Sequence, residues 1–336
     1  MTKVSADPTN RKTSLSAFMR KVYLAWALTF LYQPAYGATA LGQTRLTEMR
    51  TAYSAVSAGI GTLWLAHEDG FFKKHGLESS LIYIRGGTTA VQALLAGEIH
   101  FGHLSPAPLL TAWAQGADFV WLGTTTHQMV FTLFADPATT RGSELKGKRI
   151  GITRLGSASD LAVRMALEHF GLHPKDITFI SVGGIPEILA AMRAGAINAG
   201  ILSPPTSSAA RDLGFRPLLH IPDLGKQFTF SGIATKRSFV QSQPETIRAY
   251  MAALSGSAKI YKEDHRAALR ILRRYMRADD RILESGYREY DKALSSPPYP
   301  GLEGLEAVRA SLLDSTPQLR NVDLRKFVDD RFVRSH

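Results

Sequence analysis

The residues best suited to chemistry in this sequence are glycines and hydroxyl-bearing residues that follow apolar runs. The run Leu81–Ile84 leads into Gly86-Gly87-Thr88, and the next apolar run ends at His103, with Ser105 two residues later. We expect a helix to begin after each run, where unpaired backbone N–H groups and a partial positive charge are available. Two such helix ends at one crevice favour the binding of a small anionic or polar molecule.

A third group of this kind, Gly156-Ser157-Ala158-Ser159, lies in the second half of the chain and could bring two hydroxyls to the same ligand. Glycine, serine and threonine also form ordinary turns and helix caps, so each group has a purely structural alternative. Ligand contact is favoured because these groups follow strands, and α/β sheets bind ligands at the carboxyl ends of their strands.

Several larger side chains leave alternatives open. Arg154 could clamp a carboxylate or sulfonate with two hydrogen bonds, or could face solvent. His103 could donate a hydrogen bond to a ligand, pack as a satisfied core histidine, or act as a general base, and His127 is a weaker case of the same kind. Tyr53 and Phe230 could line a cleft or belong to the core. We expect no cofactor and no metal site, because cysteine is absent and no histidine spacing suits a metal.

The elements that must position these residues are strands and helices that alternate along the chain. A short helix capped by Thr88 or Thr89 is expected after the first Gly-Gly turn. Strand, small-residue turn and helix then repeat, which indicates parallel sheets with helices on both faces. The expected strands include 48–53, 119–123, 130–135, 149–153, 177–182, 199–202 and 228–235.

The repeat divides into two α/β blocks, roughly 45–136 and 143–230, followed by a helical tail. We expect the tail, residues 236–336, to pack on the first block, so that the chain crosses twice between two lobes. This arrangement places a ligand cleft between two sheets that can close on a hinge.

Composition narrows the possible functions. The chain of 336 residues has no cysteine, which excludes a disulfide scaffold, a thiol nucleophile and a lipid-modified cysteine. The net charge of +11 comes from scattered basic residues without interleaved aromatics, so we expect no nucleic-acid partner.

The N-terminus predicts export. Arg20 and Lys21 precede the apolar run Val22–Tyr32, and small residues follow, which is typical of a secretory signal peptide within residues 1–40. An uncleaved anchor or a buried helix is the alternative. Because residues 1–18 are polar and unlike a signal peptide, we expect Met19 to be the true start.

The order and spacing of several short motifs resemble the periplasmic substrate-binding proteins of nitrate/sulfonate/taurine-type ABC transporters. The resemblance spans about residues 48–260. Its motifs are Trp64-Leu65-Ala66, Glu68-x-Gly70-Phe71-Phe72-Lys73-Lys74-His75-Gly76-Leu77, Gly86-Gly87, Gln92–Ile99, Leu145–Gly151 and Gly184–Ile201.

The resemblance implies a two-lobed α/β fold of the type II-like periplasmic binding protein class, with no catalysis, in a periplasmic protein. It also implies delivery of the solute to a membrane permease with an ATPase. In this family the turns after the strands hold the ligand. The candidate ligand-binding residues are therefore Ser57, Gly59, Gly86, Gly87, Thr88, His103, Ser105, Thr126, Arg154, Gly156, Ser157, Ser159 and Ser203.

The ligand expected on these grounds is a small anionic or polar organic solute such as a sulfonate, nitrate or a carboxylate. Sulfonate binders often carry an aromatic and an acidic residue before the proline that matches Pro204. This chain has Leu202 and Ser203 there, which argues against an alkanesulfonate.

Two other functions remain open at this point. An enzyme of pyrimidine or quinone precursor biosynthesis on the same fold would need His103 as its base, and an export signal argues against it. A sensor that presents its ligand to a membrane receptor would use the same closed form. In every case we expect a monomer.

Overall fold

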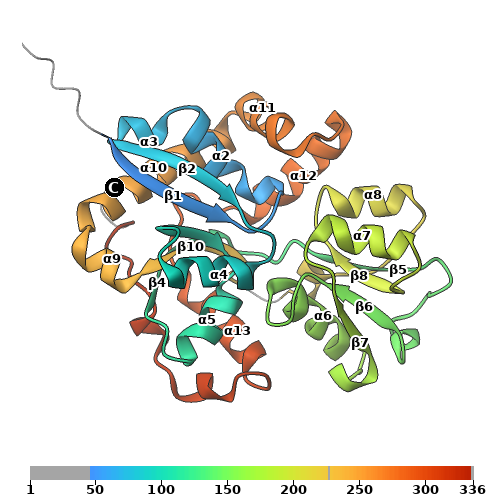
Figure 1. Cartoon of the computed structure of the whole chain (residues 1–336). Helices are drawn as coiled ribbons and strands as arrows, with labels where there is room; N and C mark the ends of the chain where they lie inside the picture. Colours follow the sequence, from blue (N-terminus) through green and yellow to red (C-terminus); the bar gives the residue numbers. More distant parts are fainter. Residues whose placement is uncertain (1–45, 226–227, 334–336) are drawn as a thin grey trace, which may run out of the picture. The chain divides into compact units, whose positions relative to one another are not determined.

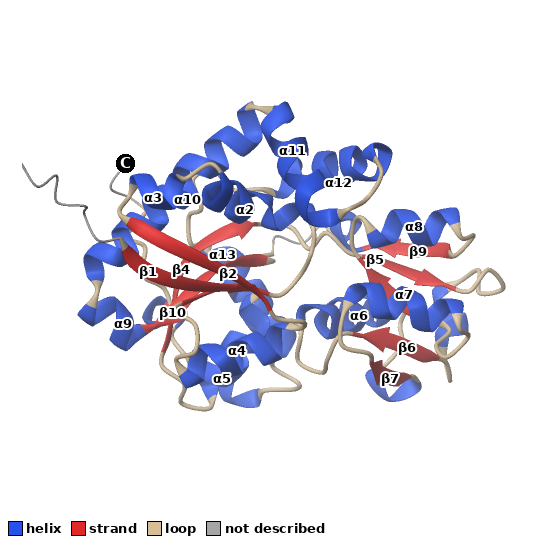
Figure 2. Ribbon diagram, turned by 45° about the horizontal axis from the view of Figure 1, so that its top comes forward, coloured by secondary structure: helices blue, strands red, loops and turns tan. Residues whose placement is uncertain are grey.

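The computed structural model describes residues 46–225 and 228–333, which form two mixed sheets with helices on both faces (Figures 1 and 2). The predicted signal peptide and the candidate start at Met19 lie outside the described residues. None of the helices in the described ranges combines the length and the apolar character needed to cross a membrane.

The first sheet has the strand order β2-β1-β3-β10-β4 and forms the first lobe. Strands β1 to β3 run parallel, whereas β10 runs antiparallel between β3 and β4. Helices α2, α3 and α10 cover one face and α4, α5 and α13 the other (Figure 1). The bounds are β1 Thr47–Tyr53, β2 Leu77–Tyr83, β3 Phe101–Leu104, β4 Phe119–Thr126, β10 Ser231–Lys236, α2 Gly61–Glu68, α3 Phe71–Lys74, α4 Gly87–Ala96, α5 Pro106–Ala114, α10 Pro244–Glu263 and α13 Leu302–Leu312.

The second sheet has the order β7-β6-β8-β5-β9 and forms the second lobe. Helix α6 lies on one face, and α7 and α8 lie on the other (Figure 1). The bounds are β5 Thr132–Ala135, β6 Arg149–Ile152, β7 Thr178–Ser181, β8 Ala199–Leu202, β9 Arg216–His220, α6 Ala158–His169, α7 Ile185–Arg193 and α8 Thr206–Asp212.

The strands that follow the two crossings between the lobes, β5 and β10, differ from the sequence-based prediction in their sheet or their direction. The strand predicted at 130–135 was assigned to the first block, 45–136, but β5 pairs with β8 and β9 in the second sheet. Both crossings, from β4 to β5 and from β9 to β10, bring the chain into its new sheet at the end where the parallel strands finish, so β5 and β10 run antiparallel to their neighbours. The sheets, expected to be parallel, are therefore mixed.

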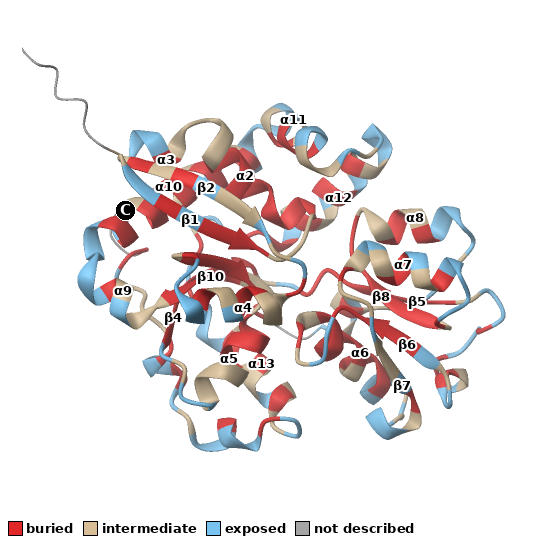
Figure 3. Ribbon diagram, viewed as in Figure 1, coloured by how far each residue is buried: buried red, intermediate tan, exposed pale blue. Residues whose placement is uncertain are grey.

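The C-terminal helices pack on the first lobe. Helix α10 lies against α2 and α3, α11 against α2 and α12, and α13 against α5. Tyr250 of α10 stacks on Phe101 of β3, with ring centroids 3.7 Å apart, and both side chains are fully buried. Most residues of strands β4, β5, β8 and β10 are buried (Figure 3). The remaining elements are α9 Arg237–Ser242, α11 His265–Met276, α12 Asp280–Ala293, and the 3-10 helices η1 Ala58–Ile60, η2 Gly142–Leu145, η3 Pro174–Asp176, η4 Ile221–Leu224, η5 Pro317–Asn321 and η6 Leu324–Lys326.

Candidate functional site

A pocket lies between the two lobes, where loops at the strand ends of both sheets face each other. The cavity there has a volume of about 70 Å³, smaller than that of most small-molecule sites. The first lobe contributes Ser54, Ala55, Ser57, Gly59, Ile60, Gly86, Gly87, His103, Leu104, Ser105, Ser231 and Tyr290. The crossing segments contribute Phe131 and Phe230, and the second lobe contributes Thr153, Ser157, Ala158, Ser159, Ile185 and Ser203.

The pocket brings together nine of the thirteen candidate residues from both halves of the chain. Their role as ligand contacts remains a prediction. The nine are Ser57, Gly59, Gly86, Gly87, His103, Ser105, Ser157, Ser159 and Ser203.

Four candidates lie outside the pocket lining. Thr126 is fully buried and follows Thr125 on β4, so its side chain points to the opposite face from the one that meets His103. The N–H of Gly156 donates to the Asp160 carboxylate at 2.8 Å and is not free for a ligand. The Arg154 side chain lies outside the lining, near Gly86 of the other lobe.

Thr88 is the fourth, and it does not cap α4 as predicted. The helix begins at Gly87 with Gly86 as its N-cap, and no side chain accepts a capping hydrogen bond there. Gly86 has φ 83°, a left-handed conformation that favours glycine and replaces the expected threonine cap.

Three helix N-termini meet at the pocket. Gly86, Ser105 and Ser157 are the N-caps of α4, α5 and α6, and all three line it. The Ser105 hydroxyl accepts from the Ala107 N–H, and the Ser157 hydroxyl accepts from the Asp160 N–H, both at 3.4 Å. These helix ends give the pocket a positive potential without any charged side chain.

The second lobe contributes a triangle of buried hydroxyls. Thr153, Ser157 and Ser159 have their side-chain oxygens 2.7 to 2.9 Å apart, and the Ser159 hydroxyl also accepts from the Thr153 N–H at 2.8 Å. Because β6 ends at Ile152 and α6 begins at Ala158, the strand-to-helix turn fixes all three side chains. The triangle can accept or donate hydrogen bonds to a ligand oxygen.

His103 supplies a neutral polar atom to the first-lobe wall. The side chain is fully buried, and its Nε2 lies 2.7 Å from the Thr125 hydroxyl, whereas Nδ1 has no hydrogen-bond partner in the described part of the chain. Burial lowers the pKa of His103 to about 3, so the ring is uncharged near neutral pH. A group with this pKa is poorly matched to general base catalysis, which favours a pKa near the working pH.

Tyr290 of α12 is a pocket residue that the sequence did not reveal. Its hydroxyl faces the side chains of Ser57 of the first lobe and Ser203 of the second, and burial raises the pKa of Tyr290 to about 12. A Cβ on Gly59 would lie 2.6 Å from the Tyr290 ring, so this glycine allows the close approach. No local pattern in the helical tail marks Tyr290, because its partners lie in distant parts of the sequence.

The rest of the wall is apolar. Phe131 and Phe230 meet edge to face with ring centroids 5.1 Å apart, and Ile60, Leu104 and Ile185 add aliphatic surface. Tyr53, considered for the wall, instead packs against Trp64 at 5.8 Å. Among residues 46–225 and 228–333, the lining includes no Asp, Glu, Lys or Arg.

Comparison with known proteins identifies a family for this chain. A family model described as NMT1/THI5 like matches residues 58–268, more than half of the chain. The chain belongs to the NMT1/THI5-like family. The predicted resemblance to nitrate/sulfonate/taurine-type binding proteins is confirmed, because a taurine-binding protein is among the sequence relatives of this NMT1/THI5-like protein, and sulfonate- and nitrate-binding proteins are among its structural neighbours.

The relatives are binding proteins of similar size. A Brucella abortus (strain 2308) protein described only as a binding protein is 24% identical over 270 residues, covering 79% of this chain and 82% of the relative. The taurine-binding periplasmic protein of Escherichia coli (strain K12) is 24% identical over 183 residues, covering 54% of this chain and 56% of that protein. The broad prediction of a binding protein agrees with both.

Solved structures show the fold. The alkanesulfonate-binding protein SsuA of Xanthomonas axonopodis pv. citri, bound to MOPS, has a TM-score of 0.72 at 21% identity and covers 84% of this chain and 98% of its own. The nitrate-binding protein NrtA of Synechocystis PCC 6803 has a TM-score of 0.65 at 15% identity, covering 86% and 88%. A DszB mutant in complex with biphenyl-2-sulfinic acid has a TM-score of 0.62 at 16% identity, covering 84% and 97%. The predicted two-lobed periplasmic binding protein fold is confirmed.

Proposed function

We propose that this NMT1/THI5-like protein is the periplasmic solute-binding component of an ABC importer, which captures a small solute between its lobes and presents it to a membrane permease and its ATPase. The observation that carries this proposal is the pocket shared by both lobes, with Ser57 and His103 on one side and Ser157 and Ser159 on the other. A solute in that position contacts both lobes only when they are closed, so binding and closure are the same event.

The lining limits the class of solute. Without a carboxylate in the described lining, an ammonium group would be buried with no counter-charge, which is costly. Without Lys or Arg there, a doubly charged anion would also be poorly compensated. We therefore propose a neutral or singly negative solute whose oxygen atoms meet the hydroxyls and N–H groups, and whose apolar part lies against Phe131 and Phe230. Taurine, which carries an ammonium group, is not expected to bind.

A thermal-shift screen followed by calorimetry tests this function. The panel contains methanesulfonate, benzenesulfonate, nitrate, acetate, benzoate, uracil, taurine and choline. One neutral or singly negative member should raise the melting temperature, because a ligand of the native state stabilises it by mass action. Stabilisation by choline alone would refute the proposal.

A matched pair of variants locates the site. Ser157→Ala removes a hydroxyl from the pocket, whereas Ser242→Ala removes one from an exposed helix end. Only Ser157→Ala should weaken binding of the panel member that stabilises the protein. Equal affinities in both variants would place binding elsewhere.

We propose no catalytic activity. The enzyme alternative depends on His103 as a base, and the low pKa of that buried ring disfavours proton abstraction. Incubation with the bound panel member, followed by mass spectrometry, should return it unchanged, and a new product would overturn this part of the proposal.

We also propose that the protein is a monomer, so light scattering should show a single peak with the mass of one chain.

A further inference from the structure

Helix α12 belongs to the first lobe but touches the second lobe along its length. At its start, Arg281 donates to the Asp212 carboxylate of α8 at 2.7 Å. Five residues later, a Cβ on Gly286 would lie 3.5 Å from Pro204. Since α12 packs on α11 and η1 of the first lobe, each of these contacts crosses between the lobes.

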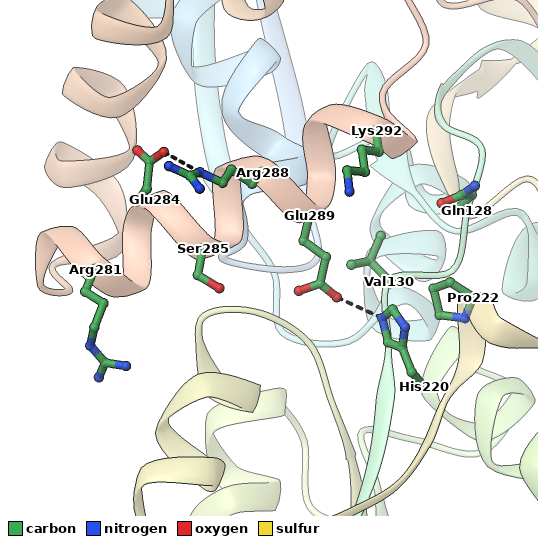
Figure 4. A pocket seen from close by; sticks show the side chains of 10 residues that line it. All are labelled: Gln128, Val130, His220, Pro222, Arg281, Glu284, Ser285, Arg288, Glu289 and Lys292. Carbon is green, nitrogen blue, oxygen red and sulfur yellow. Dashed lines mark hydrogen bonds and ion pairs between the residues drawn. The ribbon is translucent and has the colours of Figure 1, made fainter.

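The most informative crossing contact joins Glu289 to His220. His220 ends β9 of the second lobe, and its Nε2 lies 3.0 Å from the Glu289 carboxylate of α12 (Figure 4). Its Nδ1 lies 3.2 Å from the Asp223 carboxylate, which belongs to the same lobe as His220. Both ring nitrogens can donate to carboxylates only when the imidazole is protonated.

Other charged groups of α12 face the same open groove. Arg288 donates to Glu284 at 2.7 Å, and His265 is 2.8 Å from the same carboxylate, so Glu284 is engaged away from His220. The groove is also lined by Arg281 and Lys292, which oppose a positive charge on His220. Glu289 and Asp223 are the carboxylates in contact with the ring.

We propose that the contact between His220 and Glu289 is a pH-sensitive latch, in which protonation of His220 favours the closed lobes and its deprotonation favours opening. This inference depends on the lobe closure of the proposed function but not on the identity of the solute. It assigns a role to a pair that lies outside the pocket.

The sign of the pH dependence follows from the contact that is broken when the lobes open. With the lobes in contact at α12, as in this structure, the hydrogen bond to Glu289 is the largest cause that raises the pKa of His220; burial lowers it, and Asp223 adds to the rise. Opening separates His220 from Glu289 but keeps Asp223, so the pKa falls. The latch is therefore fully formed below the open-state pKa and is lost as the pH rises through the closed-state pKa.

Single-molecule energy transfer on the solute-free protein tests the latch. The chain has no cysteine, so Glu98→Cys in the first lobe and Lys175→Cys in the second, both exposed, give one labelled pair. The ratio of closed to open molecules should fall about two- to fivefold between pH 5.5 and pH 8, the range expected for a partly exposed ion pair. A ratio that does not change with pH would overturn the proposal.

Three variants in the labelled protein identify the groups. Glu289→Gln should abolish the pH dependence, whereas Asp223→Asn should move its midpoint to lower pH and keep it. Glu245→Gln removes an exposed carboxylate that pairs only within α10, with Arg248, and should match the parent protein. Unchanged pH dependence in Glu289→Gln would refute the latch, while the solute screen would still decide the proposed function separately.

Discussion

The substitution Tyr290→Phe removes one hydroxyl that joins the two lobes inside the pocket. That hydroxyl belongs to a buried side chain and faces the side chains of Ser57 and Ser203. A hydrogen bond to Ser57 lies within the first lobe and can form whether the lobes are open or closed. A hydrogen bond to Ser203 crosses between the lobes, so only the closed form loses it.

The two bonds should therefore appear in different measurements. A buried hydrogen bond contributes about 0.5–1.5 kcal/mol net, so the free energy of unfolding should fall by about 1–2 kcal/mol in urea denaturation. Solute binding depends on closure and should weaken only through the Ser203 bond, by about two- to tenfold in calorimetry. The control Tyr299→Phe changes a half-exposed tyrosine and should alter neither quantity.

A double-mutant cycle tests the reasoning directly. Tyr290→Phe and Ser203→Ala break the same crossing bond, so their effects on affinity should be clearly less than additive. Fully additive effects, or an affinity in Tyr290→Phe equal to that of the parent, would show that the hydroxyl does not couple the lobes.

Three further variants test the pocket and its support. Because burial lowers the pKa of His103 to about 3, below its ordinary 6.5, the unfolded chain gains a proton as the pH falls through 6.5 and the native state does not. This group should therefore cost the parent about 2 kcal/mol of stability between pH 7 and pH 5, and urea denaturation of His103→Gln should lack that part of the loss. Ser159→Ala leaves the buried N–H of Thr153 unpaired and should cost about 1–3 kcal/mol in urea denaturation, unlike Ser242→Ala at an exposed position; an equal stability would contradict the hydroxyl triangle. Gly123→Ala places a Cβ against the Pro298 carbonyl oxygen and should lower stability by about 1–3 kcal/mol, and an unchanged melting temperature would argue against this close contact.

The sequence was most informative where a local pattern determines the structure. The turn at Gly86 and the one at Ser157 each follow a strand and begin a helix, and both line the pocket as expected. Such turns are recognisable because glycine and hydroxyl residues stand between two strong periodic patterns. The short strand β9, Arg216–His220, was missed, because its residues are only partly buried or exposed and lack a clean alternation.

Other features could not be predicted because they depend on distant packing. The strand β5 carries the same apolar pattern whichever sheet it joins, and only pairing with β8 and β9 decides the lobe. Tyr290 lines the pocket because α12 packs beside it, and no sequence pattern near Tyr290 predicts that packing. Thr126 was predicted to bind the ligand but does not line the pocket. Because side chains alternate between the two faces along β4, only one of two adjacent threonines can contact His103, and that one is Thr125.

The arrangement of α12 joins the pocket and the latch in one rigid element. Glu289 and Tyr290 are consecutive, so their side chains leave the helix about 100° apart, one toward the outer groove with His220 and the other into the pocket. Opening breaks both contacts together, which couples the proton on His220 to the solute. Because such coupling is reciprocal, the affinity for the solute at pH 5.5 and at pH 8 should differ by the change that Glu289→Gln removes, and solute binding should draw a proton onto His220. Calorimetry in two buffers of different ionisation enthalpy measures that proton directly, and a binding enthalpy independent of buffer would exclude the coupling.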